Sequence, residues 1–182
     1  GGWQLSGTTT FGSGNPFTVF LGYDLNGDGI GGDRPFLLDP KILHRSVDNG
    51  RVNPATGLKY SQEQLPLTAF WPTADIAATR QWPWYPGTGR VGDLGRNTFR
   101  IHGQNNFDVA FIKNVRVWGE RHQVQFRAEM FNLLNRVQFD MPAYVSLVDT
   151  GVAGYRLQPR FAEITAQRNS PRWMQMSLRY TF

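Results

Sequence analysis

Trp173-Met174-Gln175-Met176-Ser177-Leu178-Arg179-Tyr180-Thr181-Phe182 is the stretch of sequence from which the fold follows. Every second residue in it is apolar: Met174, Met176, Leu178, Tyr180 and Phe182. The residues between them are polar: Gln175, Ser177, Arg179 and Thr181. Because successive side chains of a strand point to opposite faces, this stretch predicts a strand with one apolar and one polar face. Such a strand occurs against the core of a soluble protein, or in a transmembrane barrel whose apolar row meets lipid.

The composition leaves room for either environment but excludes several function classes. The 182 residues suffice for one domain with a core, and only 18% are charged, below the roughly 25% of typical soluble domains. The basic residues are mostly Arg and form no run, which argues against nucleic-acid binding. The absence of cysteine excludes disulfides, thiolate zinc sites and cysteine nucleophiles. No apolar run reaches the ~18 residues of a transmembrane helix, whereas a barrel strand needs only about 9–11 alternating residues.

Alternation predicts three further strands before the closing one at 172–182. The first lies near 3–23, as one long strand with a bulge or kink at its glycines. The others lie near 106–117 and 121–134. The cleanest alternation is in the third, with the apolar row His122, Val124, Phe126, Ala128, Met130 and the polar row Gln123, Gln125, Arg127, Glu129. We expect the polar row to be a water-facing wall with a structural role.

The connections between these strands alternate in length. Segments 24–105 and 136–171 are long and rich in turn residues, whereas the turn at 118–121 is short. Loops of this length are unusual in a compact soluble domain but are expected on the extracellular side of an outer-membrane barrel. Short helical turns are expected near 61–65, capped by Ser61 with Gln64, and near 73–79.

Several segments resemble one known family. Phe126-Arg127-Ala128-Glu129-Met130-Phe131-Asn132-Leu133-Leu134-Asn135 resembles the "FRAE-FNLFN" penultimate strand of TonB-dependent outer-membrane transporters. It is most similar to the Oar-like group, whose members often carry a carboxypeptidase-regulatory-like domain at the N-terminus. Segments 13–19, 24–35, 94–98 and 175–182 resemble further motifs of this family ("SG-PFTV", "D-NGDG…DRP", "LGRN" and "Q-ALRYTF") in the same order.

The resemblance implies an all-β fold that supplies the last four antiparallel strands of a large transmembrane barrel of the 22-stranded class. Residues 1–182 would then be the C-terminal part of a longer receptor, with the plug domain and the TonB-contacting segment upstream. The implied function is uptake of an unidentified solute across the outer membrane of a Gram-negative bacterium, driven by energy passed from the inner membrane through TonB. The implied partners are outer-membrane lipid, the barrel-assembly machinery, the plug domain and TonB. We expect no enzymatic activity, because the sequence holds no HExxH and no Gly-x-Ser-x-Gly pattern.

The closing strand also resembles the segment that the barrel-assembly machinery recognises. Its residues in that role would be Met176, Leu178, Tyr180 and Phe182. Strand addition gives a physical basis, since main-chain pairing supplies affinity and alternate side chains supply selectivity. The alternative is an ordinary apolar strand face.

The segment Asp24-Leu25-Asn26-Gly27-Asp28-Gly29 resembles the start of a calcium loop. Its candidate metal residues are Asp24, Asn26, Asp28 and Asp33. The twelfth position is Pro35 rather than the Glu that closes such a site, so Asp33 would have to substitute with another geometry. The alternative is an Asn-Gly or Asp-Gly turn that leaves a strand. No other cofactor is expected.

Aromatic side chains cluster among prolines in the first long connection. They are Trp71, Trp82, Trp84 and Tyr85. Stiff aromatic side chains stack on sugars, peptides or other ligands, fold a loop onto itself, or lie in the aromatic girdle of a barrel. The girdle suits three other residues better, because they lie at predicted strand ends: Trp3, Trp118 and Trp173.

A second interpretation is a soluble secreted β-rich domain that binds carbohydrate or another ligand through these aromatics, with or without calcium. The two interpretations differ at the row Val124, Phe126, Ala128 and Met130. In a barrel this row faces lipid, whereas in a soluble domain it packs into a core.

Overall fold

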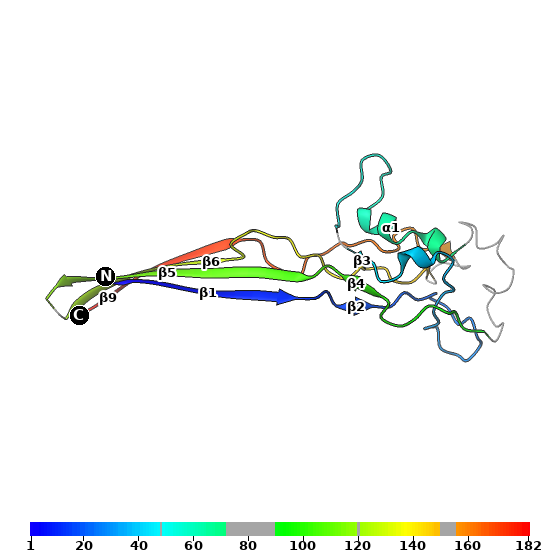
Figure 1. The fold of residues 1–182 in the computed structure, drawn as a ribbon, viewed down its shortest axis with the longest axis horizontal. Coiled ribbons are helices and arrows are strands. Elements are labelled where there is room, and N and C mark those ends of the chain that lie inside the picture. Colours follow the sequence, from blue (N-terminus) through cyan, green and yellow to red (C-terminus); the bar gives the residue numbers. More distant parts are fainter. Residues whose placement is uncertain (48, 72–89, 120, 150–155) are drawn as a thin grey trace. The chain divides into compact units, whose positions relative to one another are not determined.

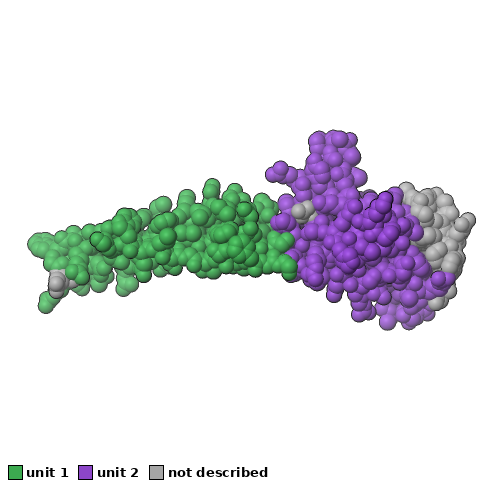
Figure 2. Space-filling model, viewed as in Figure 1, with its two compact units in different colours: residues 1–13, 103–138, 167–182 green, residues 14–102, 139–166 purple. Residues whose placement is uncertain are grey.

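The computed structural model describes residues 1–47, 49–71, 90–119, 121–149 and 156–182. It is all-β with mostly antiparallel strands, which confirms the predicted fold class at that level. The chain divides into two compact units (Figure 2): unit 1, with residues 1–13, 103–138 and 167–182, and unit 2, with residues 14–102 and 139–166. No helix within the described ranges is long and apolar enough to cross a membrane.

Unit 1 is a four-stranded antiparallel sheet in the order β1-β5-β6-β9 (Figure 1). Its strands are β1 (Trp3–Gly12), β5 (Gln104–Trp118), β6 (His122–Phe131) and β9 (Trp173–Thr181). β1 and β9 are its two edges, and the sheet is not closed on itself.

Because paired residues lie on the same face, the register of the strands places all four apolar rows on one face of the sheet. Leu5 pairs with Phe111, Phe111 with Ala128, and Ala128 with Met176. The large side chains of this face are between 40% and 73% exposed: Trp3, Leu5, Phe111, Phe126, Met174, Met176 and Leu178. We call this surface the apolar face. In the two edge strands, β1 and β9, no residue is buried on either face of the sheet.

The two ends of the sheet differ in their connections. At one end lie the tight turn between β5 and β6 and both termini of the chain (Figure 1). At the other end the chain leaves or rejoins the sheet at Gly12, Gln104, Phe131 and Trp173, where the long connections begin and end. We call these the turn end and the connection end.

The first predicted strand, 3–23, is shorter than expected. β1 ends at Gly12, and the chain then enters unit 2, where a Cβ built on Gly14 would lie 1.6 Å from the carbonyl oxygen of Ile101. Beyond Pro16, alternate residues from Phe17 to Leu25 are buried: Phe17, Val19, Leu21, Tyr23 and Leu25. The alternation at 17–25 therefore belongs to the core of unit 2 and does not continue β1.

The third predicted strand, 121–134, also ends early. Asn132 has φ +50° and Asn135 has φ +47°, both in the left-handed region. An extended strand cannot continue through such a residue, so β6 stops at Phe131.

Unit 2 is built from short elements around a core of its own. Its elements are β2 (Pro16–Phe17), η1 (Pro40–Ile42), β3 (Ser46–Val47), α1 (Tyr60–Gln64), η2 (Leu67–Ala69), β4 (Phe99–Ile101), β7 (Val148–Asp149) and β8 (Arg156–Leu157). β2 and β3 both pair with β4, the latter in parallel, and β7 pairs with β8. The largest side chains exposed by less than 2% include Trp71, Phe70, Phe99, Phe161, Leu21 and Leu147. The two long connections thus share one hydrophobic core.

The helical turn predicted near 61–65 corresponds to α1, but its cap differs. The backbone N–H of Lys59 donates to the Gln62 side-chain oxygen at 3.0 Å. Ser61 is instead buried, and its hydroxyl has no hydrogen-bond partner within the described chain. The turn predicted at 73–79 lies outside the described residues.

Candidate functional site

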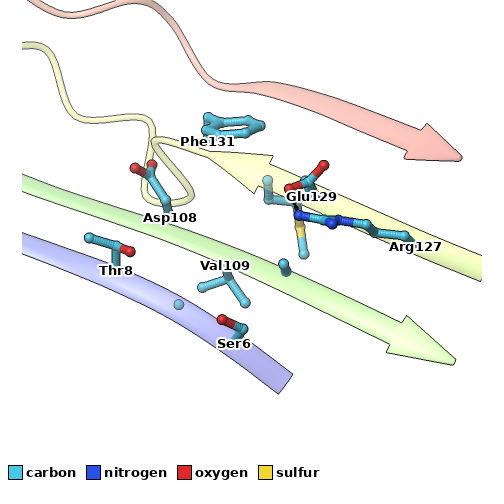
Figure 3. A pocket seen from close by; sticks show the side chains of 10 residues that line it. Ser6, Thr8, Asp108, Val109, Arg127, Glu129 and Phe131 are labelled. Carbon is cyan, nitrogen blue, oxygen red and sulfur yellow. Dashed lines mark hydrogen bonds and ion pairs between the residues drawn. The ribbon is translucent and has the colours of Figure 1, made fainter. Parts of the chain in front are cut away.

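The polar face of unit 1 carries a cavity of about 240 Å³ over three neighbouring strands (Figure 3). Its lining residues come from β1, β5 and β6: Ser6, Gly7, Thr8, Asp108, Val109, Ala110, Arg127, Glu129, Met130 and Phe131. Arg127 and Glu129 form an ion pair, with Arg127 Nη2 donating to Glu129 Oε1 at 2.6 Å. Both residues are on one strand and two positions apart, so the strand itself places their side chains on the same face.

Asp108 is a carboxylate of this cavity that two hydrogen bonds hold in place. Its Oδ1 accepts hydrogen bonds from Asn106 Nδ2 at 2.9 Å and from the backbone N–H of Asn132 at 2.8 Å. Its Oδ2 and the hydroxyls of Ser6 and Thr8 have no hydrogen-bond partner in the described part of the chain. The cavity therefore offers acceptors and hydroxyls that a bound molecule can use.

A second cavity of about 220 Å³ lies next to the first at the connection end. It shares Asp108 and Phe131 with the first cavity and adds Gln104, Asn106, Asn132, Gln138, Asn169, Ser170, Pro171 and Trp173. Phe131 and Trp173 are directly paired across β6 and β9, and their rings stack with centroids 4.1 Å apart and planes 12° apart. The two cavities thus meet at an aromatic pair and a carboxylate.

Asn132 holds the connection end of the sheet together. Its side chain is 6% exposed, accepts from the backbone N–H of Arg136, and donates to the carbonyl oxygens of Arg136 and Ser170. Its own backbone N–H donates to Asp108. The resemblance singled out this asparagine as part of Phe126–Asn135, but nothing in its spacing indicated that it joins segments 38 residues apart.

The register corrects one assignment to the aromatic girdle. Trp173 pairs with Phe131 and shares its face with Gln175 and Ser177, so it lies on the polar face rather than the apolar face. Trp3 does lie on the apolar face, where the Lys113 ammonium sits 4.5 Å from the centre of its ring. A position at a strand end does not fix the face, because the face alternates with each residue.

Asp24 closes the predicted calcium loop with backbone hydrogen bonds. Its carboxylate accepts from the N–H groups of Gly27 at 2.6 Å, Asp28 at 3.2 Å and Gly29 at 2.7 Å. The hydrogen bond from Gly29 is the main cause that lowers the pKa of Asp24 below its usual value of 3.8, because it stabilises the ionised form. Gly29 has φ +87°, a conformation that favours glycine.

Asp33 is brought to the same loop. Its Oδ2 accepts from the backbone N–H of Leu25 at 2.6 Å and of Asn26 at 3.0 Å. Asn26 and Asp28 bond to each other through side chains at 3.0 Å. Among the described residues, no group of three or more His, Cys, Asp or Glu residues is placed to hold a metal. The geometry describes a turn closed by its own carboxylates, and calcium binding stays a prediction.

Of the four residues in the predicted aromatic cluster, the structure describes Trp71. Its side chain is 1% exposed and packs in the core of unit 2, so it does not form a ligand-binding surface. Trp82, Trp84 and Tyr85 lie outside the described residues.

The predicted assembly residues form a continuous exposed row on β9 and its end. Met176 is 67% exposed, Leu178 73%, Tyr180 55% and Phe182 87%. At the turn end, Tyr180 stacks on the ring of His122, and its hydroxyl lies 2.5 Å from His122 Nδ1. The row is therefore accessible along its whole length.

The chain matches a known protein family. A family model described as "Outer membrane beta barrel domain" matches residues 1–175. Comparisons with curated proteins and with solved structures give no match.

Proposed function

Because the chain belongs to the family of outer membrane β-barrel domains and lies in the outer membrane of a Gram-negative bacterium, we propose that it is part of a TonB-dependent transporter. Its four-stranded sheet supplies the last strands of a large barrel of the 22-stranded class. The transporter takes up an unidentified solute with energy passed from the inner membrane through TonB. We assign it no enzymatic activity.

The observation that carries the proposal is the uncovered apolar face. None of Val124, Phe126, Ala128 and Met130 is buried, so this row does not pack into a protein core. On β5 the face runs from Phe107 to Val117, ten residue steps of about 3.4 Å, which at a tilt near 40° span about 25 Å. That height equals the lipid-facing band of outer-membrane barrels.

The two edges of the sheet support the same proposal. Unpaired N–H and C=O groups on β1 and β9 would cost several kcal/mol each in lipid, so the sheet needs further strands at both edges. A barrel that continues at β1 and closes at β9 supplies them. The soluble alternative would require a core over the apolar face, whereas the large side chains of this face are exposed.

The finer assignment to TonB-dependent transporters is supported by the motifs. Phe126–Asn135 now has a physical role, because it combines the lipid-facing row of β6 with the asparagine turn that ends it. The proposed partners are lipid at the apolar face, the barrel-assembly machinery at Met176–Phe182, and a plug domain against the polar face. TonB would act through that plug.

The proposal is tested by following which solutes cells remove from a defined medium. We compare a strain that has the full protein, a deletion strain, and a strain that has the protein but lacks TonB. We expect at least one solute to be depleted by the first strain only. Depletion that persists without TonB would contradict the proposal.

A further inference from the structure

We propose that the two cavities on the polar face are adjacent subsites for a neutral oligosaccharide. This inference rests on the proposed function, because it places the polar face in the lumen of the transporter and makes the sugar its solute. It concerns residues that the sequence patterns did not single out as a binding site, above all Ser6, Thr8, Asp108, Phe131 and Trp173.

The size and arrangement of the cavities favour a chain of small units. Their volumes are about 240 and 220 Å³, and each is smaller than the roughly 300 Å³ at which pockets for drug-sized molecules begin. They are nearly equal, and Asp108 and Phe131 line both. Two adjacent open compartments that share a boundary suit two consecutive units of an oligomer.

The aromatic pair gives these compartments a flat apolar surface. Phe131 and Trp173 stack on each other at 4.1 Å, which fixes both rings, and Trp173 remains 47% exposed. Fixed aromatic rings supply a large rigid contact area at low entropic cost, and the C–H face of a sugar ring can lie against them.

The polar groups of the first cavity suit a ligand that carries hydroxyl groups better than a charged ligand. The first cavity presents the hydroxyls of Ser6 and Thr8, the unpartnered Oδ2 of Asp108 and the guanidinium of Arg127 (Figure 3). Carboxylates accept from sugar hydroxyls, and the guanidinium donates to hydroxyl or ring oxygens. Asp108 and Glu129 against Arg127 give the first cavity a formal charge of −1, which disfavours a polyanionic ligand.

The position of the cavities along the sheet suits capture of an incoming solute. Phe131 and Trp173 are the residues at which β6 ends and β9 begins, so the second cavity lies at the connection end. Long connections lie on the extracellular side in outer-membrane barrels. The subsites would therefore be near the extracellular mouth of the lumen, and the plug domain would meet the polar face nearer to the turn end.

The experiment measures binding to the full protein that contains this chain, purified in detergent. The probes are maltohexaose, cellohexaose and mannohexaose, followed by calorimetry, with hexalysine as a cationic probe. We expect one hexasaccharide to bind with a Kd below about 1 mM. Phe131→Ala and the double variant Ser6→Ala/Thr8→Ala should each weaken it at least about tenfold, equivalent to 1.4 kcal/mol.

The double variant is informative because neither hydroxyl has a partner in the described fold, so its loss leaves the sheet intact. Gln123→Ala is the matched control, since Gln123 lies on the same face at the turn end, away from both cavities. The inference is overturned if no hexasaccharide binds, if the variants bind like the parent protein, or if hexalysine binds more tightly than every sugar. If one of these binding results is found and solute uptake still depends on TonB, only the sugar assignment is refuted. If solute uptake continues without TonB, the proposed function is refuted.

Discussion

Asn132 is the residue on which the connection end of the sheet depends, because it combines a left-handed backbone with three side-chain hydrogen bonds. We predict that Asn132→Ala lowers the free energy of unfolding by about 2–4 kcal/mol, since each lost bond contributes about 0.5–1.5 kcal/mol and the left-handed conformation adds strain. Asn132→Gly keeps the backbone conformation and isolates the side-chain contribution. Urea unfolding in detergent checks both, and an unchanged midpoint for Asn132→Ala would refute the role.

Asp24 makes the turn at the start of unit 2 sensitive to acid. Its pKa is lowered in the folded protein, so the stabilisation that it contributes is fully present above the unfolded pKa of about 3.9 and is lost as the pH falls through the lower folded pKa. We predict that the amide signals of Gly27 and Gly29, followed by NMR, change with a midpoint below 3.8. A midpoint at or above that value would contradict the hydrogen-bonded geometry.

The same signals test the calcium prediction. If the loop binds calcium, millimolar calcium shifts the amides of Gly27 and Gly29 at neutral pH, and Asp24→Asn abolishes the shift. If the loop is only a turn, calcium leaves both signals in place. The sequence indicated that Asp24 and Asp33 belong together, but it could not show that backbone N–H groups already occupy their oxygens.

At the scale of the strand, the alternation in β9 predicts opposite responses at neighbouring positions. Leu178 lies on the apolar face and is paired with Phe126, whereas Ser177 lies on the polar face and is paired with Arg127. We predict that Leu178→Arg destabilises the protein in lipid vesicles by about 2–4 kcal/mol, because a charge at mid-membrane must leave water. Ser177→Arg should cost far less. Equal effects of the two changes would contradict the assignment of the faces.

A change at the end of β9 can separate recognition by the barrel-assembly machinery from the stability of the folded protein. Deletion of Phe182, which is 87% exposed, removes few contacts within the chain. We therefore expect the deletion to lower the amount of folded protein in the outer membrane of cells while refolding into vesicles in vitro proceeds as before. Thr181→Ala on the polar row is the control. A deletion that assembles normally in cells would show that Phe182 is an ordinary strand residue.

Sequence alternation predicted strand faces well where it is regular, as in β6 and β9. The face of each side chain follows from the period of two along a strand. It failed at 3–23, where two alternating stretches are separated by Gly14, and the second stretch is buried in another unit. The assignment of Trp173 to the girdle was wrong for another reason: it used the position of Trp173 at a strand end, whereas the alternation itself places this residue on the face of Gln175 and Ser177. The failure at 3–23 depends on contacts between segments far apart in sequence, which local patterns do not report.

At the scale of the whole molecule, the long connections form a folded unit rather than free loops. Phe99 is fully buried and contacts the rings of Phe17 and Phe70, which come from distant segments. We predict that Phe99→Ala lowers the stability of unit 2 by about 3–5 kcal/mol, measured as faster hydrogen exchange at its protected amides. Val91→Ala, at a side chain that is 55% exposed, should change exchange by less than about 0.5 kcal/mol. Equal exchange in both variants would mean that unit 2 has no cooperative core.

The account depends most on the claim that the apolar face of the sheet meets lipid. A single cysteine with a nitroxide label can be placed at each position from Met174 to Arg179 of the full protein in lipid vesicles, because the 182 residues contain no cysteine and any cysteine elsewhere in the full protein is first replaced by serine. We predict that oxygen, which concentrates in the bilayer, relaxes the labels at Met174, Met176 and Leu178, whereas a water-soluble nickel chelate relaxes those at Gln175, Ser177 and Arg179. Labels at the apolar positions that are shielded from oxygen, or that are equally open to the nickel chelate, would contradict the membrane assignment.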